Sequence, residues 1–408
     1  MNTVINAAKS SGVDLALVLP PSERFQAANA GAISLCVRDF AKFSAYLPRL
    51  TVYGASVDQP YPGIPFRGLP TESRLGSRRM AYLLGLAKAF AADRPRYVEI
   101  YNRPEFVGWV RLMAPRAAIS LYLCNDPQRM RRFRTLTERQ AMLRRLDAVF
   151  CVSDFIRDRL LEGIDDLALA QRAITARFGF DLPAFDARVS ALQPERENLI
   201  LFVGRIVEEK GAELFVDAVA RALGGRTGWR AVMVGADRPP VGHDARTAPV
   251  SPYETRVRAR VASINHARQT PLIEMTGFMT QDEVLALYGR AAIAVVPSLW
   301  EEPLCRTAIE AMAMRCPLIS TDRGGLRELV HGAAVVIEPT TSERLAALIG
   351  ELADDPVRRE MLARLGRSRL DADGYDIRKV AALMDRVRCR RLGLPDVEGV
   401  SSDSRHAT

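Results

Sequence analysis

The sequence predicts an α/β protein built from two doubly wound domains. Its 408 residues exceed what one ordinary domain holds and suit two domains of roughly 200 residues each. Short apolar runs alternate with helical patterns along the chain, which is typical of parallel sheets covered by helices. Between residues 178 and 198 a turn and a polar stretch interrupt this alternation, and it then restarts. We therefore interpret 178–198 as an interdomain linker.

The first half has the apolar runs of five strands, and the residues between them have helical patterns. The expected strands are Val13–Leu19, Leu50–Gly54, Tyr97–Tyr101, Ala118–Leu123 and Ala148–Val152. The expected helices are Ala32–Ser44, Ser77–Ala92, Arg103–Met113, Met130–Leu146 and Ser153–Glu162, the last with polar residues at its start that can cap it.

The second half repeats this pattern with six strands. They are expected at Leu199–Val203, Arg230–Val234, Leu272–Thr276, Ile293–Val296, Leu318–Ser320 and Ala334–Ile337. Helices are expected at Ala212–Leu223, Glu254–Ile264, Asp282–Ala291, Leu304–Ala313, Ser342–Ala353, Pro356–Leu370 and Ile377–Arg391. We expect one domain over residues 1–190, a second over 191–375, a helix within 376–395 and a disordered tail over 396–408. Two such domains facing each other would form a ligand cleft at the carboxyl edges of their sheets.

The composition is that of a globular protein, with 48% hydrophobic and 26% charged residues. No run approaches the roughly 18 to 20 apolar residues that span a bilayer, and the first residues do not resemble a secretory signal. We therefore expect a soluble protein of the cytoplasm. The six cysteines are far apart, without a CxxC pair, so reduced and buried thiols are expected instead of disulfides or a zinc site.

The net charge is +9, which favours anionic partners. Arginines are densest between Arg129 and Arg145, where only Glu138 is acidic. This cluster fits either a solvated helix face or an anchor for an anionic membrane surface or an acidic acceptor. Its single aromatic residue, Phe133, does not form an interleaved series that would stack bases, and no nucleic-acid-binding motif is present, so nucleic acid is not an expected partner.

Two segments of the second half have residue types that suit a nucleoside-diphosphate sugar. The loop after Val203 contains Arg205 and Lys210 and enters a helix, and cations at a helix N-terminus suit a diphosphate. Glu302 and Glu310 are eight residues apart; on one helix this spacing is about 12 Å at ~1.5 Å per residue. That is roughly the length from the hexose to the ribose of a nucleotide sugar. Glu310 lies among apolar residues, where a carboxylate needs a ligand or a hydrogen-bonded partner.

These segments resemble the family 4 retaining glycosyltransferases, which have the GT-B fold (glycosyl transferases group 1). The stretch Pro297–Ala313 resembles that family's E-x7-E signature, and Val203–Gly211 resembles its first loop of the C-terminal domain. Thr321–Glu328 resembles the later Gly-Gly loop, and Met275–Phe278 the strand end that holds the base. The resemblance is strong over residues 198–340. It implies an N-terminal acceptor-binding domain, a C-terminal domain that binds the nucleotide sugar, and a last helix that crosses back to the N-terminal domain.

The resemblance also implies roles for individual residues. Arg205 and Lys210 would bind the donor diphosphate and stabilise the leaving nucleotide. Glu302 would contact hydroxyls of the transferred sugar near its anomeric carbon, and Glu310 would hold the ribose. Further donor contacts are implied for the backbone amides of Leu304, Cys305 and Arg306, for Phe278 and Met279 beside the base, and for Gly235 in the cleft.

The chain departs from the family pattern in places. Cys305 stands where the family usually has glycine, and Cys124 where it often has a histidine close to the sugar. All four histidines fall beyond residue 240, so we infer that Asn125 or Asp126, or carbonyl groups there, replace that histidine. The acceptor-side loop is reduced to a single glycine, Gly31, which still permits a close approach of the backbone.

The function expected from this resemblance is retaining transfer of a hexose from a UDP- or GDP-sugar to a glycan or lipid-linked acceptor, in cell-surface polysaccharide or lipopolysaccharide biosynthesis. The alternatives are a sugar-nucleotide epimerase of the same fold and a non-catalytic nucleotide-sugar- or glycan-binding protein. No metal is expected, because Asp371-Ala372-Asp373 follows an arginine-rich helix and precedes a glycine, which indicates a turn and not a metal-binding strand end.

Overall fold

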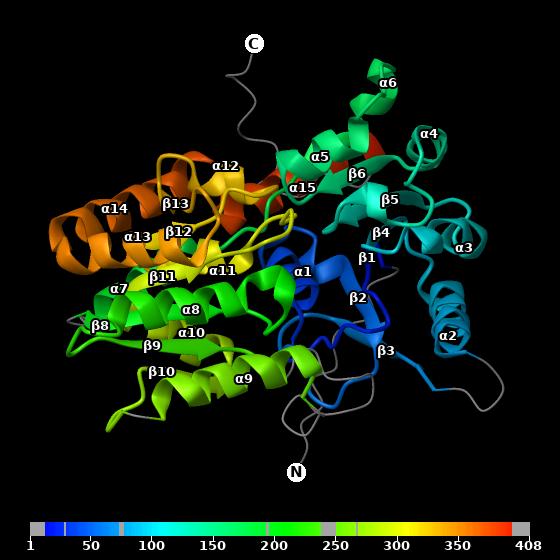
Figure 1. Cartoon of the computed structure of the whole chain (residues 1–408). Helices are drawn as coiled ribbons and strands as arrows, with labels where there is room; N and C mark the ends of the chain where they lie inside the picture. The colour runs from blue at the N-terminus through cyan, green and yellow to red at the C-terminus, as the bar shows by residue number, and fades with distance from the viewer. Residues whose placement is uncertain are drawn as a thin grey trace. The chain divides into compact units, whose positions relative to one another are not determined.

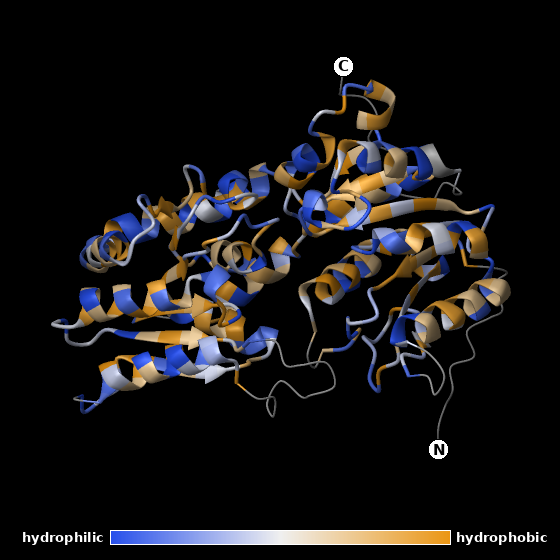
Figure 2. Ribbon diagram, turned by 45° about the vertical axis from the view of Figure 1, so that its right-hand side comes forward, coloured by the Kyte–Doolittle hydropathy of each residue, from blue (hydrophilic) through white to orange (hydrophobic). Residues whose placement is uncertain are grey.

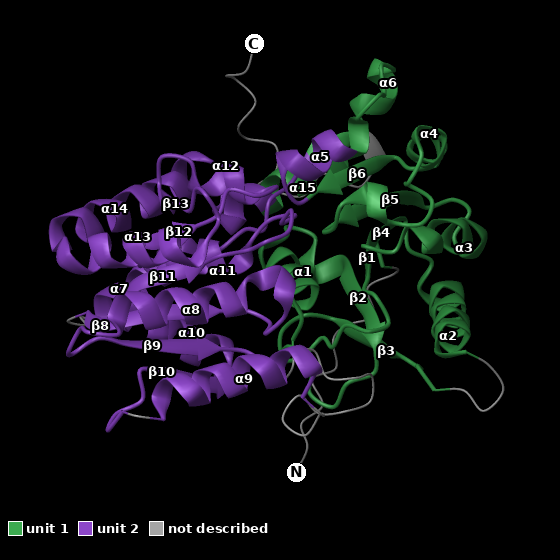
Figure 3. Cartoon of the chain, viewed as in Figure 1, with its two compact units in different colours: residues 1–151, 160–174, 381–408 green, residues 152–159, 175–380 purple. Residues whose placement is uncertain are grey.

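A computed structural model describes residues 13–27, 30–72, 77–192, 196–237, 250–266 and 268–393. The chain forms two compact units (Figure 3). Unit 1 comprises residues 1–151, 160–174 and 381–408, and unit 2 comprises residues 152–159 and 175–380. Asn29, residues 193–195 of the expected linker and the expected tail over 396–408 lie outside the described residues.

Unit 1 contains a sheet of seven strands in the order β3-β2-β1-β4-β5-β6-β7 (Figure 1), and the neighbours from β3 to β6 run parallel. The strands are β1 Leu15–Val18, β2 Leu50–Ala55, β3 Phe66–Leu69, β4 Tyr97–Tyr101, β5 Ala118–Leu123, β6 Ala148–Cys151 and β7 Ala173–Thr175. The helices are α1 Ala32–Phe43, α2 Arg78–Asp93, α3 Val107–Met113, α4 Leu136–Arg145, α5 Asp154–Leu161 and α6 Leu167–Ala170, with short 3-10 turns η1 Leu47–Arg49, η2 Pro104–Phe106 and η3 Pro127–Arg129.

Unit 2 contains a parallel six-stranded sheet in the order β10-β9-β8-β11-β12-β13. The strands are β8 Glu197–Val203, β9 Arg230–Val234, β10 Ile273–Gly277, β11 Ala291–Val296, β12 Leu318–Ser320 and β13 Val335–Val336. The helices are α7 Leu182–Leu192, α8 Ala212–Leu223, α9 Pro252–Asn265, α10 Gln281–Arg290, α11 Arg306–Ala313, α12 Leu326–Val330, α13 Ser342–Asp354 and α14 Pro356–Ala372, with the 3-10 turn η4 Glu208–Lys210. Helix α15, Ile377–Leu392, begins in unit 2 and belongs to unit 1 from Ala381 onward.

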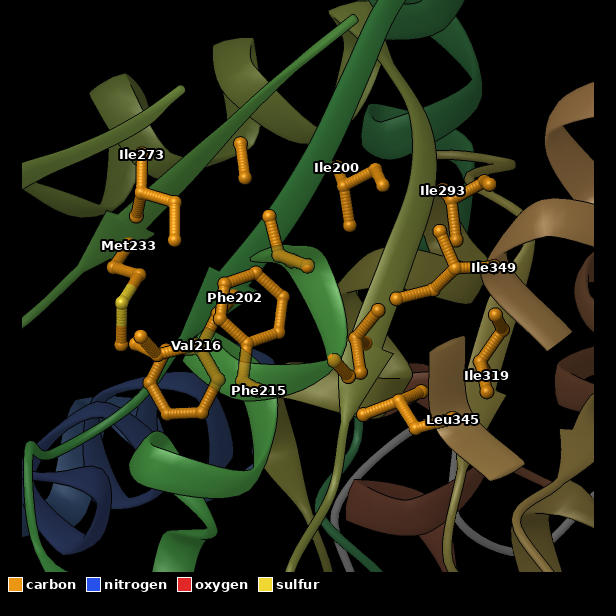
Figure 4. Close-up of a cluster of buried hydrophobic side chains, with 14 of the residues drawn as sticks. Ile200, Phe202, Phe215, Val216, Met233, Ile273, Ile293, Ile319, Leu345 and Ile349 are labelled. Atoms are coloured by element: carbon orange, nitrogen blue, oxygen red, sulfur yellow. The ribbon is translucent and has the colours of Figure 1, made fainter. Parts of the chain in front are cut away.

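The burial of the strands explains why both sheets could be predicted from the sequence. Every residue of β4 and β11 is buried, as expected for parallel strands covered on both faces. In Figure 2 the strands are largely orange, whereas the helices carry both colours. Helix α8 has the pattern expected of a helix that covers a sheet, because its buried residues Phe215, Val216 and Val219 recur at helical spacing and face the sheet. Figure 4 shows this core, in which α8 and α13 contribute Phe215, Val216, Leu345 and Ile349 against the strands.

The expected linker at 178–198 is wrong. Leu182–Leu192 is helix α7, and Asp181 accepts a hydrogen bond from the Ala184 amide (3.3 Å) at its start. The preceding Phe178 and Phe180 are buried, and the Phe180 amide donates to the Tyr375 carbonyl (2.8 Å). This segment is therefore packed into unit 2, and the change of unit falls at Thr175, before the expected boundary at residue 190.

The helix expected over Met130–Leu146 is also too long, because α4 begins only at Leu136. A capping box sets this start: the Thr135 hydroxyl accepts from the Glu138 amide, and the Glu138 carboxylate accepts from the Thr135 amide. The helix expected over Arg103–Met113 begins as the 3-10 turn η2. Strands β3 and β7, helices α6, α7 and α12 and the short 3-10 turns were not expected, and the other strands and helices agree with expectation within about two residues at each end.

Helix α7 provides a test through Asp186, whose carboxylate binds Arg367 Nη2 (2.6 Å) and Arg315 (3.1 Å). The hydrogen bond from Arg367 lowers the pKa of Asp186 below its ordinary value. A carboxylate with a depressed native pKa stabilises the fold above its unfolded pKa and loses that contribution as pH falls. We expect Asp186→Asn to cost about 1 kcal/mol at pH 7, since the pair is partly exposed. Urea unfolding at pH 7 and pH 3 should show a smaller difference at pH 3, because the contribution is lost as pH falls from the unfolded pKa towards the lowered native pKa. An equal difference at both pH values would contradict it.

Candidate functional site

The candidate site lies on unit 2 at the carboxyl ends of β8, β11 and β12. The strand order reverses between β8 and β11, and ligands of doubly wound sheets bind at such a point. Three loops leave these strand ends, over residues 204–211, 297–305 and 321–325. They contain the cations, the first glutamate and the two glycines that the sequence singled out.

The centre of the site is an ion pair between the first two loops. Lys210 Nζ lies 2.5 Å from Glu302 Oε1, and the Ser298 hydroxyl donates to the same oxygen (2.5 Å). Glu302 is only 3% exposed, so these two donors replace the water that would otherwise solvate its carboxylate. The Lys210 ammonium also lies 5.4 Å from the ring centroid of Trp300. The pair therefore places a fixed carboxylate and a fixed cation side by side.

Backbone contacts hold the three loops in register. The Leu299 amide donates to the Glu209 carbonyl (2.8 Å), and the Gly325 amide donates to the Glu302 carbonyl (2.6 Å). Gly324 has φ of 60°, and a Cβ there would lie 2.4 Å from the Glu302 carbonyl oxygen. Only glycine permits this approach, so the Gly-Gly loop fixes the backbone on which Glu302 is carried.

Ser153, directly before α5, supports the same loop. Its hydroxyl donates to the Pro303 carbonyl (2.5 Å) and accepts from the Ile156 amide (3.1 Å). The Glu328 carboxylate accepts hydrogen bonds from the amides of Asp154 and Phe155. Burial raises the pKa of Glu328 and these amides lower it, with burial the larger effect. Sequence reasoning treated Ser153 only as a helix cap.

Helix α11 begins at Arg306, two residues later than expected, with Cys305 at its N-cap. Glu302 therefore lies before the helix, and the separation expected for two glutamates on one helix axis does not apply to it. Cys305 makes no side-chain capping hydrogen bond, so the first turn of α11 keeps the anion-binding character of a helix N-terminus. Burial and the Glu302 carboxylate raise the pKa of the Cys305 thiol to about 11, so this buried thiol remains protonated near neutral pH.

Glu310 is buried on α11 and is hydrogen-bonded within the protein. Its Oε1 accepts from Arg306 Nε (2.9 Å) and Gln281 Nε2 (3.2 Å), and the Arg306 guanidinium lies 4.6 Å from the Phe180 ring centroid. The apolar neighbours of Glu310 had indicated a ligand or a hydrogen-bonded partner, and the structure supplies the partner.

The other donor contacts predicted for unit 2 differ in how exposed they are. Arg205 pairs with Glu209 at 3.7 Å and stays more than a third exposed. Phe278 is exposed and Met279 partly so, just after β10, while Leu304 is buried. Gly235 has φ of 129°, and its amide donates to the Gly277 carbonyl (2.8 Å), which joins the ends of β9 and β10.

Two neighbours of the ion pair were not identified from the sequence as site residues. Ser298 is buried and binds Glu302, as described above. The Trp300 indole Nε1 is buried and has no hydrogen-bond acceptor within the described part of the chain. The only sign in the sequence that these two residues belong to the site was their position between β11 and Glu302. An indole N–H without an acceptor suits a bound ligand that offers one.

Gly31, Asn125 and Asp126 belong to unit 1. Gly31 precedes α1, where the Ser34 amide donates to the Glu23 carboxylate (3.2 Å). Asn125 is exposed after β5, and the Asp126 carboxylate accepts from the Gln128 amide (2.9 Å) at the start of η3. They lie after β1 and β5 of their own sheet.

Asp371 and Asp373 each pair with an arginine one helical turn earlier, Arg367 and Arg369, at 2.7 Å. Across the described ranges, no three His, Cys, Asp or Glu side chains are grouped as a metal site would require. The described helices include none with the length and apolar character needed to cross a membrane.

Comparison with known proteins gives a consistent family. Residues 185–369 match the model of glycosyl transferases group 1. A putative glycosyltransferase of Bacillus subtilis, YtcC, is 25% identical over 323 residues, which are 74% of each chain. The lipopolysaccharide core biosynthesis mannosyltransferase LpsB of Rhizobium meliloti is 28% identical over 65% of this chain and 74% of its own.

Solved structures agree on the fold. The structure of HepE from Anabaena with UDP-glucose matches 91% of this chain and 98% of its own with a TM-score of 0.67 at 16% identity. That likeness shows the GT-B fold, as the two sheets led us to expect. Fold, family model and relatives agree with the loops of unit 2: the chain is a glycosyltransferase, and its residues 185–369 belong to the glycosyl transferases group 1 family.

Proposed function

We propose that the chain transfers a hexose from a UDP- or GDP-sugar to a hydroxyl of a glycan or lipid-linked acceptor, with retention at the anomeric carbon. The observation that carries the proposal is the buried Lys210–Glu302 pair beside the N-terminus of α11. A diphosphate sugar needs cations and amides for its phosphates and a fixed acceptor for its sugar hydroxyls. This site combines all of these groups within three adjoining loops.

In the proposed reaction, Lys210 and Arg205 bind the diphosphate and stabilise the charge that develops as the bond from the anomeric carbon to the phosphate oxygen breaks. Glu302 orients the sugar through its hydroxyls, and Glu310 binds the ribose after exchanging some of its present hydrogen bonds. The acceptor oxygen forms the new bond on the same face that the phosphate leaves. Its proton passes to the leaving phosphate oxygen.

We also propose that the donor needs no divalent metal, and the cationic side chains and the α11 amides support this, because they can neutralise phosphate charge themselves. The donor and pathway are supported by relatives. HepE was solved with UDP-glucose, and LpsB acts in lipopolysaccharide core biosynthesis. We extend these to the present chain as a nucleotide-sugar donor and an acceptor from cell-surface polysaccharide or lipopolysaccharide synthesis.

A donor screen tests the proposal. The melting temperature is measured with UDP-, GDP- and ADP-sugars, each with EDTA, and the stabilising donor is then incubated with candidate acceptors. We expect one nucleotide class to raise the melting temperature by several degrees, since ligand at 100 times Kd adds about 2.7 kcal/mol. Isomerised donor without acceptor would indicate an epimerase, and donor binding without transfer to any acceptor would indicate a binding protein. A requirement for added metal would contradict the proposed phosphate site.

A further inference from the structure

The positive charge of this protein is concentrated in one segment of unit 1. Residues 77–145 contain fifteen Lys or Arg and five Asp or Glu, a net charge of +10. The whole chain carries +9, so the rest of the chain is close to neutral. The excess charge is therefore a local property of the segment that forms α2, β4, α3, β5 and α4. It extends well beyond the arginines between Arg129 and Arg145.

Topology brings the helices of this segment to one side of the sheet. The connections from β3 to β4, β4 to β5 and β5 to β6 all step in the same direction across the strand order. Right-handed crossovers then place α2, α3 and α4 on the same face, opposite α1. Figure 1 shows these three helices along one side of the unit 1 strands. We call their outer surface the α2–α4 face.

Large apolar side chains project from the α2–α4 face into solvent. Leu112 is 77% exposed and Leu84 64%, while Met80, Trp109 and Leu136 are 40% or 41% exposed. Met80 and Leu84 are one turn apart on α2, and the exposed Lys88 follows one turn later. Every one of the three helices contributes at least one such side chain.

The same segment carries many exposed cations, on these helices and in the connections between the helices and strands. Arg139 is the exception within the cluster, because it is buried and donates to the Glu162 carbonyl (2.5 Å). The arginines of residues 77–145 that are exposed are Arg78, Arg79, Arg94, Arg96, Arg116, Arg129, Arg131, Arg132, Arg134, Arg144 and Arg145. Solvation alone accounts for exposed arginines, whereas several exposed large apolar side chains on one face are typical of a binding surface.

We propose that the α2–α4 face docks on a membrane surface that contains anionic phospholipids. Lipid headgroups supply negative charge to the arginines, and the acyl boundary just beneath them accepts leucine, methionine and tryptophan side chains. A nucleic acid or an anionic polysaccharide offers charge but no layer in which Leu112 and Leu84 become buried. The inference rests on the proposed function only in that a lipid-linked acceptor would be presented at this surface.

The full chain is mixed with sedimentable vesicles, either of phosphatidylethanolamine with phosphatidylglycerol as the minor component or of phosphatidylcholine alone. We expect sedimentation with the anionic vesicles only, reversed by about 0.5 M NaCl, because screening weakens attraction at the surface. The Leu84→Glu, Leu112→Glu double variant should bind at least tenfold more weakly. Arg131→Glu with Arg132→Glu should lower binding similarly, without touching an apolar side chain.

The matched control is Val357→Glu on α14, which is 79% exposed but belongs to unit 2 and should bind as the unchanged protein does. Circular dichroism melts confirm that each variant folds, and donor-induced stabilisation reports the sugar-nucleotide site separately. Equal binding to both vesicle types, undiminished binding of the double variant, or binding to heparin or DNA but not to anionic vesicles would overturn the proposal. Vesicle binding without sugar transfer would refute the proposed function and leave the docking surface standing.

Discussion

Replacement of Glu302 by glutamine should lower the rate of sugar transfer about a hundred- to thousandfold, the cost of removing one preorganised polar group from an active site. Glutamine keeps the size of the side chain but removes the charge that holds Lys210 Nζ at 2.5 Å. Lys210 then loses its partner in a mostly buried position, and the sugar loses a fixed hydrogen-bond acceptor. The measurement is the steady-state rate with the donor and acceptor found in the screen.

Glu301 provides the matched control for that variant. It is the adjacent residue with the same side chain, but it is exposed, whereas Glu302 is 3% exposed. Glu301→Gln should transfer sugar at the rate of the unchanged protein, and both variants should melt within a few degrees of it. If Glu302→Gln retains full turnover, Glu302 does not touch the transferred sugar. If both variants lose activity equally, the loop and not the carboxylate is responsible.

Replacement of Arg388 by methionine should destabilise unit 1 by about 3–5 kcal/mol, the cost of leaving a buried charge without its partner. Arg388 is buried on α15, where its guanidinium binds both oxygens of Glu99 (2.9 Å each) and Asp385 (2.7 Å). Burial lowers the pKa of Arg388, but the Glu99 and Asp385 carboxylates raise it by more. The net pKa is raised, so the guanidinium remains charged. Asp385 in turn accepts from the Ser44 hydroxyl (2.9 Å). Methionine leaves both carboxylates without this cation.

Arg390→Met on the same helix is the control, because Arg390 is exposed and the change in sequence is identical. Guanidinium unfolding should show little change for Arg390→Met. The double variant Glu99→Gln, Arg388→Met should be more stable than Arg388→Met alone, since the unpaired carboxylate is removed together with its partner. Strictly additive losses would show that the two side chains do not stabilise each other.

The sequence predicted those parts of the fold whose burial follows a simple period. β4, β5 and β9 match their expected bounds because each is mostly apolar, with a single polar or charged residue. β3 escaped detection because only Leu69 of its four residues is buried. α7 was taken for a linker because a turn precedes it and a polar stretch follows it. What holds it is tertiary, since Asp186 binds arginines that follow 129 and 181 positions later. Local patterns do not contain such partners.

The candidate site divides in a similar way. The types of the site residues could be recognised in the sequence, and the resemblance assigned them to one site. Which of these residues pair with each other could not be recognised. Lys210 and Glu302 are 92 positions apart, and the hydrogen bond from Ser298 requires the bend of the 297–305 loop. The argument from the spacing of the two glutamates assumed a helix that begins too early, because α11 starts only at Arg306. Glu310 was correctly expected to need a partner, but Gln281, 29 positions earlier, was not identifiable as that partner.

The chain contributes to unit 1 in three separate pieces, and the last of them holds Arg388. A fragment cut at residue 190 would therefore retain the buried Glu99 and discard the guanidinium that pairs with it. Separate expression of unit 1 therefore requires α15 from Ala381 onward to be rejoined to the earlier pieces of that unit, by a linker or by circular permutation. The division of this protein into two parts therefore depends on the last helix, α15, and not on a cut near the midpoint of the chain.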